Sequence, residues 1–228
     1  MLKASHLSFR HAGAVSPAIS DVSFTLEKGM VMLLCGCNGA GKSTLLKLLA
    51  GLIIPSSGTV SLAHGRPSLI LQDPEQQILG STVLEDLLLP WSRPTESMRA
   101  KALSILEDLD LEAYADHSPH VLSGGQKRRL CIASALMEEP GVLLMDEPAS
   151  GLDYPGCVQL AGIIAKLRCQ GASFIIATHD PVIFLPAMRE NDRIIILKSG
   201  RLCLDASPEK ACAAMQRHPE WGVRPCHA

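Results

Sequence analysis

Short, uninterrupted hydrophobic runs recur along this chain and alternate with segments of helical periodicity. Five of the runs have the length of strands, at residues 31–35, 69–71, 142–145, 174–177 and 194–197. Continuous runs of this kind are typical of strands that are buried on both faces of a parallel sheet. A further strand is predicted at residues 23–26, in a partly alternating N-terminal stretch that Gly13 and Pro17 interrupt.

Three helical patterns lie between the hydrophobic runs. Residues 43–49 form the first, which Gly51 is placed to end, and residues 158–167 form another, with Gly171 shortly after it. A third helix has its hydrophobic face at Met98, Ala102, Ile105, Leu106 and Leu109. Strands that alternate with helices predict an α/β fold.

Residues 73–120 follow a different pattern, which is helical, contains no strong strand and includes Pro90 and Pro94. Thr82 and Glu85 have the spacing of a capping box that opens a helix. This segment is therefore predicted to be a helical insertion into the α/β core. Beyond residue 205, Ser207 as the cap and a proline after it predict one short helix, followed by a tail.

The composition excludes several classes of protein. The 228 residues suffice for one large domain or a domain with a small subdomain, and 47% hydrophobic with 19% charged residues excludes a disordered chain. The 21 basic and 23 acidic residues give a net charge of −2, which argues against a general nucleic-acid binder. No hydrophobic stretch approaches the roughly 20 residues that span a bilayer, and residues 1–6 lack the hydrophobic part of a signal peptide. We expect a cytoplasmic protein that cannot cross a membrane alone.

The eight cysteines are scattered, and several lie inside hydrophobic runs, where a thiol behaves as a small hydrophobic group. Cys35 and Cys37 are separated by one residue, so they lack the spacing of zinc or redox motifs. All eight, including Cys226, are therefore predicted to be structural.

Residues 36–43 have the sequence GCNGAGKS, which fits the P-loop pattern between a strand and a helix. Glycines at these positions let backbone amides and the helix N-terminus surround phosphate oxygens. Lys42 is predicted to reach the β- and γ-phosphates, and Ser43 to ligate Mg²⁺. Taken alone, the pattern also fits a glycine-rich turn.

Asp146 and Glu147 follow the hydrophobic run 142–145. A carboxylate at the end of a buried strand is typical of a Walker B segment, so Asp146 is predicted to hold Mg²⁺. Glu147 is predicted to point to the opposite side, because successive side chains of a strand alternate, and to act as a general base on an attacking water. The structural alternative is a pair of capping carboxylates.

Residues 122–126, with the sequence LSGGQ, predict a helix that Ser123 caps and whose first turn contains Gly124 and Gly125. Each glycine costs about 1 kcal/mol relative to alanine and leaves an amide uncovered at the positive end of the helix. A capped helix start alone does not explain two such glycines. The segment matches the signature motif of ABC ATPases at every position, and the chain resembles that family from about residue 7 to residue 208.

Other motifs of the family follow in the expected order. Gln72 is at the Q-loop position, near Mg²⁺ and the lytic water, and residues 150–153 match the D-loop, which contacts the opposing subunit. His179 is at the switch position, which meets the γ-phosphate; a lone histidine after a strand would otherwise be read as a cap or core residue.

The resemblance implies a fold and a set of site residues. The fold is a P-loop NTPase (RecA-like) core with a mostly parallel sheet, an N-terminal antiparallel β subdomain and an inserted helical subdomain. The core would comprise residues 1–72 and 121–205, the helical subdomain 73–120, and the C-terminal helix and tail 206–228. The implied catalytic residues are Glu147, His179 and Gln72, and the implied Mg²⁺ ligands are Ser43, Gln72 and Asp146. The implied ATP-binding residues are Gly36, Asn38, Gly39, Ala40, Gly41, Lys42, Ser43, Thr44 and His11, with Ser123, Gly124, Gly125, Gln126 and Asp153 acting across a dimer.

The Q-loop continuation, QDPEQQIL at residues 72–79, resembles that of energy-coupling-factor and cobalt-type importers, as do TVLED at 82–86 and QKRR at 126–129. A solvated loop and helix start is the alternative for this polar stretch. The resemblance implies an ATPase subunit that forms a homo- or heterodimer around two ATP. Its other partners would be a transmembrane subunit and a substrate-binding membrane component, on the cytoplasmic face of the membrane, with no nucleic acid. These importers take up vitamins or Co²⁺ and Ni²⁺ ions.

Two positions depart from the family pattern. His11 stands where the family often has an aromatic residue on the adenine, and an imidazole offers less stacking area than tyrosine. Tyr154 displaces the usual proline after Asp153 to position 155, for which we expect a small difference in the D-loop without loss of activity.

The competing readings are an exporter ATPase, a soluble ABC protein of translation or DNA repair, and a switch that does not hydrolyse ATP. The Q-loop run disfavours an exporter. The 228 residues leave no room for the paired cassettes or long insertions typical of soluble ABC proteins. The presence of both Glu147 and His179 argues against a switch that does not hydrolyse ATP.

Overall fold

The computed structural model describes residues 1–225 and contains two β-sheets. The larger sheet has the strand order β5-β6-β7-β3-β8-β9. Its strands are β5 (Pro67–Ile70), β6 (Val142–Asp146), β7 (Phe174–Thr178), β3 (Val31–Cys35), β8 (Arg193–Lys198) and β9 (Arg201–Ala206). Neighbouring strands are parallel except at the β8–β9 hairpin. Every residue of β3, β6 and β7 is buried, as the continuous hydrophobic runs predict.

The smaller sheet is antiparallel, with the order β2-β1-β4. Its strands are β1 (Leu2–Phe9), β2 (Ile19–Leu26) and β4 (Ser57–Leu62). Helix α1 (Lys42–Leu49) lies between the two sheets, because Leu45 and Leu46 share one hydrophobic core with Leu2 of β1 and Leu34 of β3. This packing positions the N-terminus of α1 near the end of β3, to which the loop 36–41 joins it.

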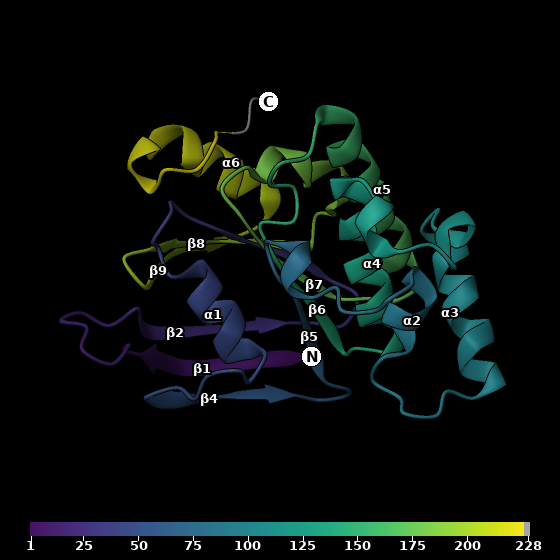
Figure 1. The fold of residues 1–228 in the computed structure, drawn as a ribbon. Coiled ribbons are helices and arrows are strands. Elements are labelled where there is room, and N and C mark those ends of the chain that lie inside the picture. Colours follow the sequence, from purple (N-terminus) through teal and green to yellow (C-terminus); the bar gives the residue numbers. More distant parts are fainter. Residues whose placement is uncertain (226–228) are drawn as a thin grey trace.

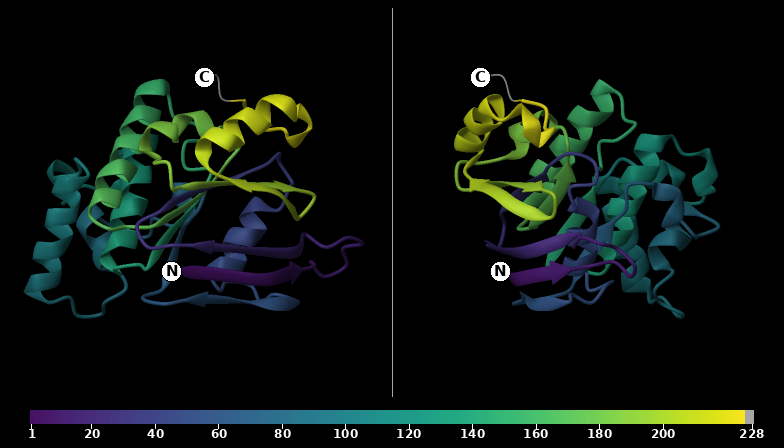
Figure 2. Two further views of the ribbon diagram at one scale, coloured as in Figure 1. Left: turned by 180° about the vertical axis from the view of Figure 1, so that it is seen from behind. Right: turned by 90° about the vertical axis from the view of Figure 1, so that its left-hand side faces the viewer.

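The remaining helices cover the other face of the large sheet or one of its edges. They are α2 (Val83–Leu88), α3 (Glu96–Asp108), α4 (Gly124–Met137), α5 (Tyr154–Cys169) and α6 (Pro208–Arg217). Short 3₁₀ helices occur at Pro74–Gln76, Glu112–Tyr114, Pro119–Val121, Pro181–Ile183, Leu185–Ala187 and Pro219–Trp221. Helices α2, α3 and α4 pack against one another, and they lie at the opposite end of the molecule from α6 (Figures 1 and 2).

The α/β fold with an antiparallel N-terminal sheet is confirmed, and the five predicted core strands are present within one or two residues. Strands β1, β4 and β9 are not predicted individually. In β1 the left-handed backbone of His6 interrupts the alternation, with irregular pairing between Ala4 and Leu7. β4 is largely exposed and contains few large hydrophobic residues, so it has no buried run for a pattern to detect.

The helix caps predicted from the sequence are present in part. Thr82 accepts a hydrogen bond from the Glu85 amide at 3.1 Å, which is one half of the predicted capping box. Ser207 occupies the N-cap position of α6, but its side chain makes no capping hydrogen bond. The division of the chain into core, helical insertion and C-terminal segment stays a prediction; α4, which follows the predicted insertion, packs on α2 and α3 as well as on β5.

The cysteines make no disulfide among residues 1–225, and Cys226 lies outside the described residues. Cys35, Cys131 and Cys157 are buried, whereas Cys169 and Cys203 are exposed. A membrane-crossing helix would need a long apolar stretch, and no helix within residues 1–225 has one.

Candidate nucleotide site

The loop between β3 and α1 requires glycine at two positions for steric reasons. Gly36 has a φ of 150°, and a side chain there would clash with the main-chain oxygen of Leu197 in β8. Gly41 has a φ of 107°, and an added Cβ would lie 2.7 Å from the main-chain oxygen of Ala18. Because these are backbone neighbours, which cannot move aside as a flexible side chain could, the loop is held in one shape with the α1 N-terminus facing outward.

Lys42, the first residue of α1, is buried and directed back over this loop. Its Nζ donates a hydrogen bond to the main-chain oxygen of Gly36 at 2.9 Å and lies 3.2 Å from Oε1 of Glu147. Ala40 is also buried, and its main-chain oxygen accepts from the amide of Gly200 at 2.9 Å. The lysine therefore provides a fixed positive charge at the mouth of an amide-lined loop.

Asp146 and Glu147 both face the start of α1. The Asp146 carboxylate accepts a hydrogen bond from the Ser43 side chain, and Glu147 pairs with Lys42. The predicted alternation of these two side chains is wrong, because Glu147 lies beyond β6 with a φ of 46°, and a left-handed residue ends the extended geometry on which alternation depends. The positive φ of a non-glycine residue is a local strain that the surrounding contacts must offset.

The two carboxylates leave buried oxygens that no protein group satisfies. Oδ1 of Asp146 and Oε1 of Glu147 have no hydrogen-bond partner, although the latter is within ion-pair range of Lys42. Burial raises the pKa of Asp146, the Ser43 hydrogen bond opposes that rise, and the neighbouring charge of Glu147 adds to it. Two carboxylates beside one lysine give the site an excess of negative charge, which a divalent cation would neutralise.

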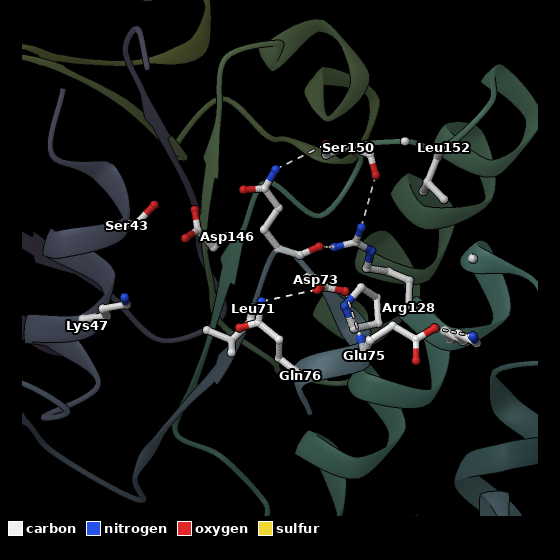
Figure 3. A pocket seen from close by; sticks show the side chains of 15 residues that line it. Ser43, Lys47, Leu71, Asp73, Glu75, Gln76, Arg128, Asp146, Ser150 and Leu152 are labelled. Atoms are coloured by element: carbon white, nitrogen blue, oxygen red, sulfur yellow. Dashed lines mark hydrogen bonds and ion pairs between the residues drawn. The ribbon is translucent and has the colours of Figure 1, made fainter. Parts of the chain in front are cut away.

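The residues present fit a Mg²⁺ ion that takes some of its ligands from the protein and the others from water or a bound molecule. The Ser43 hydroxyl and the Asp146 carboxylate are oxygen ligands of the kind that Mg²⁺ takes. Figure 3 shows these two side chains pointing toward each other at one end of a pocket. Among residues 1–225 there is no group of three His, Cys, Asp or Glu side chains able to hold a metal ion alone. This arrangement suits an ion bound through one carboxylate, waters and phosphate oxygens.

His179 follows β7 and contacts the second oxygen of Glu147. Its Nδ1 lies 2.9 Å from Oε2 of Glu147, and its amide donates to the same oxygen at 3.4 Å. The imidazole is 58% exposed, so it faces the solvent side of the carboxylate. Glu147 thus lies between Lys42 and His179, with one oxygen directed to each.

A cavity of about 330 Å³ brings several predicted residues together. It is lined by His11, Ala18, Asn38, Gly39, Gly41, Lys42, Ser43, Thr44, Gln72 and Glu147. The His11 ring is exposed and packs edge-on against Phe9, with ring centroids 4.9 Å apart. His11, just after β1, therefore lies on the same cavity as the phosphate loop, and its predicted place against an adenine ring stays a prediction.

A second cavity, of about 630 Å³, opens on the other side of Ser43 and Gln72 and extends to α4. Gln72 donates from Nε2 to the Ser150 hydroxyl at 3.4 Å, which joins the segment after β5 to the segment after β6 (Figure 3). Asp146 lies at the sheet end of this cavity and Gly124 at the helical end. Gln72 is thus the one predicted site residue, apart from Ser43, that lines both cavities.

The signature segment faces the phosphate loop of its own chain across the larger cavity, which Gly124 and Ser43 both line. Ser123 caps α4 in a reciprocal capping box with Gln126, with distances of 2.8 and 3.3 Å. An added Cβ at Gly124 would meet nothing within 4 Å, so contacts inside this chain do not require that glycine. Asp153 is exposed and caps α5 by accepting from the Gly156 amide at 2.9 Å, and it lines neither cavity.

Arg128 is a site residue that the sequence reasoning did not identify. Its guanidinium is buried and donates to the main-chain oxygens of Gln72 at 2.8 Å and Ser150 at 3.2 Å. Burial lowers its pKa. Lys127 beside it forms an ion pair with Glu75. The basic run 127–129 is visible in the sequence, but which of its members turns inward depends on the phase of α4.

Comparison with known proteins gives consistent results. The sequence profile described as "ABC transporter" matches residues 19–150. The energy-coupling factor transporter ATP-binding protein EcfA2 of Methanospirillum hungatei is 36% identical over 216 residues, which are 86% of this chain. The chain spans only 53% of that relative's length. The cobalt import ATP-binding protein CbiO of Rhodobacter capsulatus is 34% identical over 242 residues, covering 99% of this chain and 85% of the relative.

Among solved structures, cbiO1 of Clostridium perfringens, described as part of the ABC transporter complex cbiONQ, superposes with a TM-score of 0.83. The sequences are 28% identical, and the match covers 96% of this chain and 94% of the other. The similarity therefore extends over both sheets and the helical layer, beyond the matched profile.

Proposed function

Because this chain belongs to the ABC transporter family, we propose that it is an ATP-binding and ATP-hydrolysing subunit. It closes as a dimer around two ATP and powers a membrane importer for a vitamin or a transition-metal ion. The observation that carries the hydrolytic part is the position of Glu147 between Lys42 and His179, at 3.2 and 2.9 Å.

The phosphate-binding part of the proposal rests on the loop 36–43 and the α1 N-terminus. Amides of the loop and the charge of Lys42 would hold the phosphates, and the Lys42 contacts to Gly36 and Glu147 would give way to phosphate oxygens. Ser43, Asp146 and Gln72 are the residues proposed to hold Mg²⁺, which would neutralise phosphate charge. His11, exposed beside the loop, is proposed to lie against the base.

The hydrolytic step would use Glu147 as the general base. Its carboxylate accepts a proton from water as the water oxygen forms a bond to the γ-phosphorus and the bond to the bridging oxygen of ADP breaks. His179 would orient the carboxylate and meet the γ-phosphate, and Gln72 would hold the water. Burial and the strained φ of Glu147 fix the direction of its carboxylate, which favours a base that needs little reorganisation.

Dimerisation is proposed from the open helix start of the signature segment. Ser123, Gly124, Gly125 and Gln126 form an amide-rich helix start, and Gly124 has open space around it on a cavity that Ser43 of the loop 36–43 also lines. Such an end binds phosphate if a second subunit presents one. Asp153, at the α5 N-cap, is proposed to contact that subunit.

The importer branch is supported by the QDPEQQIL run at residues 72–79 and by the similarity to energy-coupling factor and cobalt import ATP-binding proteins. A transmembrane subunit and a substrate-binding membrane component would be the partners, and the protein would lie at the cytoplasmic face of the membrane. An exporter ATPase is the second candidate, since the signature and P-loop motifs do not separate the two directions of transport.

The test of the hydrolytic part is the Glu147→Gln variant, with Glu139→Gln as a matched control on an exposed glutamate that pairs with Lys101. With MgATP, Glu147→Gln should lose turnover by roughly 10²–10⁴-fold while retaining ATP binding and gaining a dimer in size-exclusion chromatography. Equal turnover in the two variants would contradict the assigned base.

The role in transport has a separate test. We expect the tagged protein to co-purify with a polytopic membrane protein from its native cells. A stable complex with ribosomes or DNA instead would contradict the proposed role in transport.

A further inference from the structure

The segment after α6 returns across the molecule to the candidate site. It begins with the 3₁₀ turn Pro219–Trp221, in which the Trp221 ring stacks on His218 with centroids 4.4 Å apart. Trp221 and Val223 are only 8% and 7% exposed and belong to the main hydrophobic core. Two buried side chains on either side of Gly222 therefore fix the path of this segment.

The segment makes two contacts with the residues around the switch histidine. The amide of Arg224 donates to the main-chain oxygen of His179 at 3.0 Å. The guanidinium of Arg224 pairs with Oδ2 of Asp180 at 2.7 Å. One residue thus holds both the peptide of His179 and the side chain that follows it.

The same segment touches the phosphate loop. Gly222 has a φ of 63°, and a Cβ added there would lie 2.7 Å from the Cβ of Cys37. Cys37 is the second residue of the loop 36–43, and its main-chain oxygen lies 3.4 Å from Lys42 Nζ. Residues 222–224 therefore bridge the loop that would hold phosphate and the histidine that would meet it.

We propose that Arg224 is a positioning residue, which holds the His179 ring against Glu147 by binding the His179 carbonyl and the Asp180 carboxylate. This inference rests on the proposed function, because it concerns the geometry of the hydrolytic step. His179 follows β7, in a turn that the Thr178 hydroxyl also holds, by accepting from the Asp180 amide at 3.0 Å, and the His179 amide donates to Glu147 Oε2 at 3.4 Å.

Removal of the guanidinium would leave Asp180 without its cation. Its side chain is 16% exposed, and Oδ1 is already buried without a hydrogen-bond partner. A carboxylate that loses its ionic partner in such a place turns toward water. Because Asp180 is adjacent to His179, that movement would rotate the peptide that directs the imidazole to Glu147.

The test compares Arg224→Ala, Arg224→Lys and the control Arg193→Ala in the full chain. Arg193 forms an equivalent ion pair with Asp205 at 2.7 Å, but at the start of β8, the end of the sheet away from the loop. We expect Arg224→Ala to lower kcat for MgATP by roughly 10- to 100-fold, as for a displaced catalytic group, with KM within about twofold because the phosphate-binding groups remain. Arg224→Lys should recover most of kcat, and Arg193→Ala should match the wild type.

Two further measurements separate this inference from the function on which it rests. In an Asp180→Asn background, Arg224→Ala should add little further loss of kcat, since the two residues act through one contact. Amide hydrogen exchange of residues 178–183 without nucleotide should accelerate in Arg224→Ala and stay unchanged in Arg193→Ala. If the wild type hydrolyses ATP and Arg224→Ala equals Arg193→Ala in kcat and exchange, the positioning role is overturned. A wild type without ATPase activity but with accelerated exchange in Arg224→Ala would overturn the proposed function and retain the contact.

Discussion

The guanidinium of Arg128 donates a hydrogen bond to the main-chain oxygen of Gln72, across a distance of 2.8 Å. This bond ties the first turns of α4, the helix that begins within the signature segment, to the peptide that carries the Q-loop side chain. A second bond, to Ser150 at 3.2 Å, adds the D-loop to the same cation. Three segments that are distant in the sequence therefore share one buried charge.

Replacing Arg128 should loosen this junction. We expect Arg128→Ala to lower the free energy of unfolding by roughly 1–3 kcal/mol, because two carbonyl groups lose a charged donor while the cost of burying the guanidinium is recovered. Urea denaturation measures the loss, and Arg99→Ala on the exposed face of α3 is the control, with an expected change below about 0.5 kcal/mol. Equal stability of the two variants would show that the junction is held by other contacts.

Asp146 should lower the stability of the nucleotide-free protein at neutral pH. Its pKa is raised in the folded state, chiefly by burial, so the folded state favours the protonated acid. The carboxyl group therefore supports folding at low pH, and this support is lost as the pH rises through the raised pKa. Asp146→Asn, which is uncharged at every pH, should consequently be more stable than the wild type at pH 7 and lose that advantage toward pH 4.

Thermal unfolding of both proteins between pH 4 and pH 8, without nucleotide and with a chelator, tests this prediction. The gain at pH 7 should be accompanied by loss of ATP hydrolysis, since the same carboxylate is proposed to hold Mg²⁺. An unchanged difference in Tm across the pH range would show that Asp146 titrates as it does in the unfolded chain.

The glycines of the phosphate loop should differ in their tolerance of alanine. Gly36→Ala forces a Cβ against the main-chain oxygen of Leu197, whereas Gly39, with a φ of 79°, has nothing within 4 Å of an added Cβ. Gly39→Ala should cost about 1–2 kcal/mol of stability, from the left-handed backbone alone, and Gly36→Ala should cost clearly more. Chemical denaturation without nucleotide measures both, and similar losses would indicate that β8 moves aside easily.

The thiols should differ sharply in reactivity. Burial raises the pKa of Cys131 to about 12, with the charge of Asp86 as the next cause, so this residue has almost no thiolate at pH 8. We expect iodoacetamide to label the exposed Cys169 and Cys203 at pH 8 and to leave Cys131 unlabelled until denaturant is added. Mass spectrometry of tryptic peptides identifies the labelled positions, and rapid labelling of native Cys131 would contradict the burial of its side chain.

The sequence predicts the buried part of this fold well and the half-exposed part poorly. β3, β6 and β7 are buried on both faces, so their sequences are continuous hydrophobic runs with clear ends. β9 is an edge strand whose residues alternate between half-buried and exposed, and its pattern is too weak to distinguish from a loop.

In the candidate site, the sequence predicts the residues that lie in short motifs, but not the orientations that depend on the rest of the structure. Lys42, Ser43, Asp146 and His179 lie in short motifs whose order along the chain indicates their roles. The direction of Glu147 depends on a left-handed φ after β6, and the inward turn of Arg128 depends on tertiary packing. Neither is encoded in a local pattern of residues.

The place of β3 in the large sheet has a consequence for the synthesis of the chain. β3 is made early, but it pairs with β7 on one side and β8 on the other, so its partners emerge from the ribosome more than 100 residues later. Until then a wholly hydrophobic strand and the adjoining phosphate loop have no sheet to join. Pairing over such sequence distances is slow and leaves apolar edges exposed. A nascent chain stalled before residue 174 should therefore depend on chaperones and be unable to retain nucleotide, although its phosphate loop is already complete.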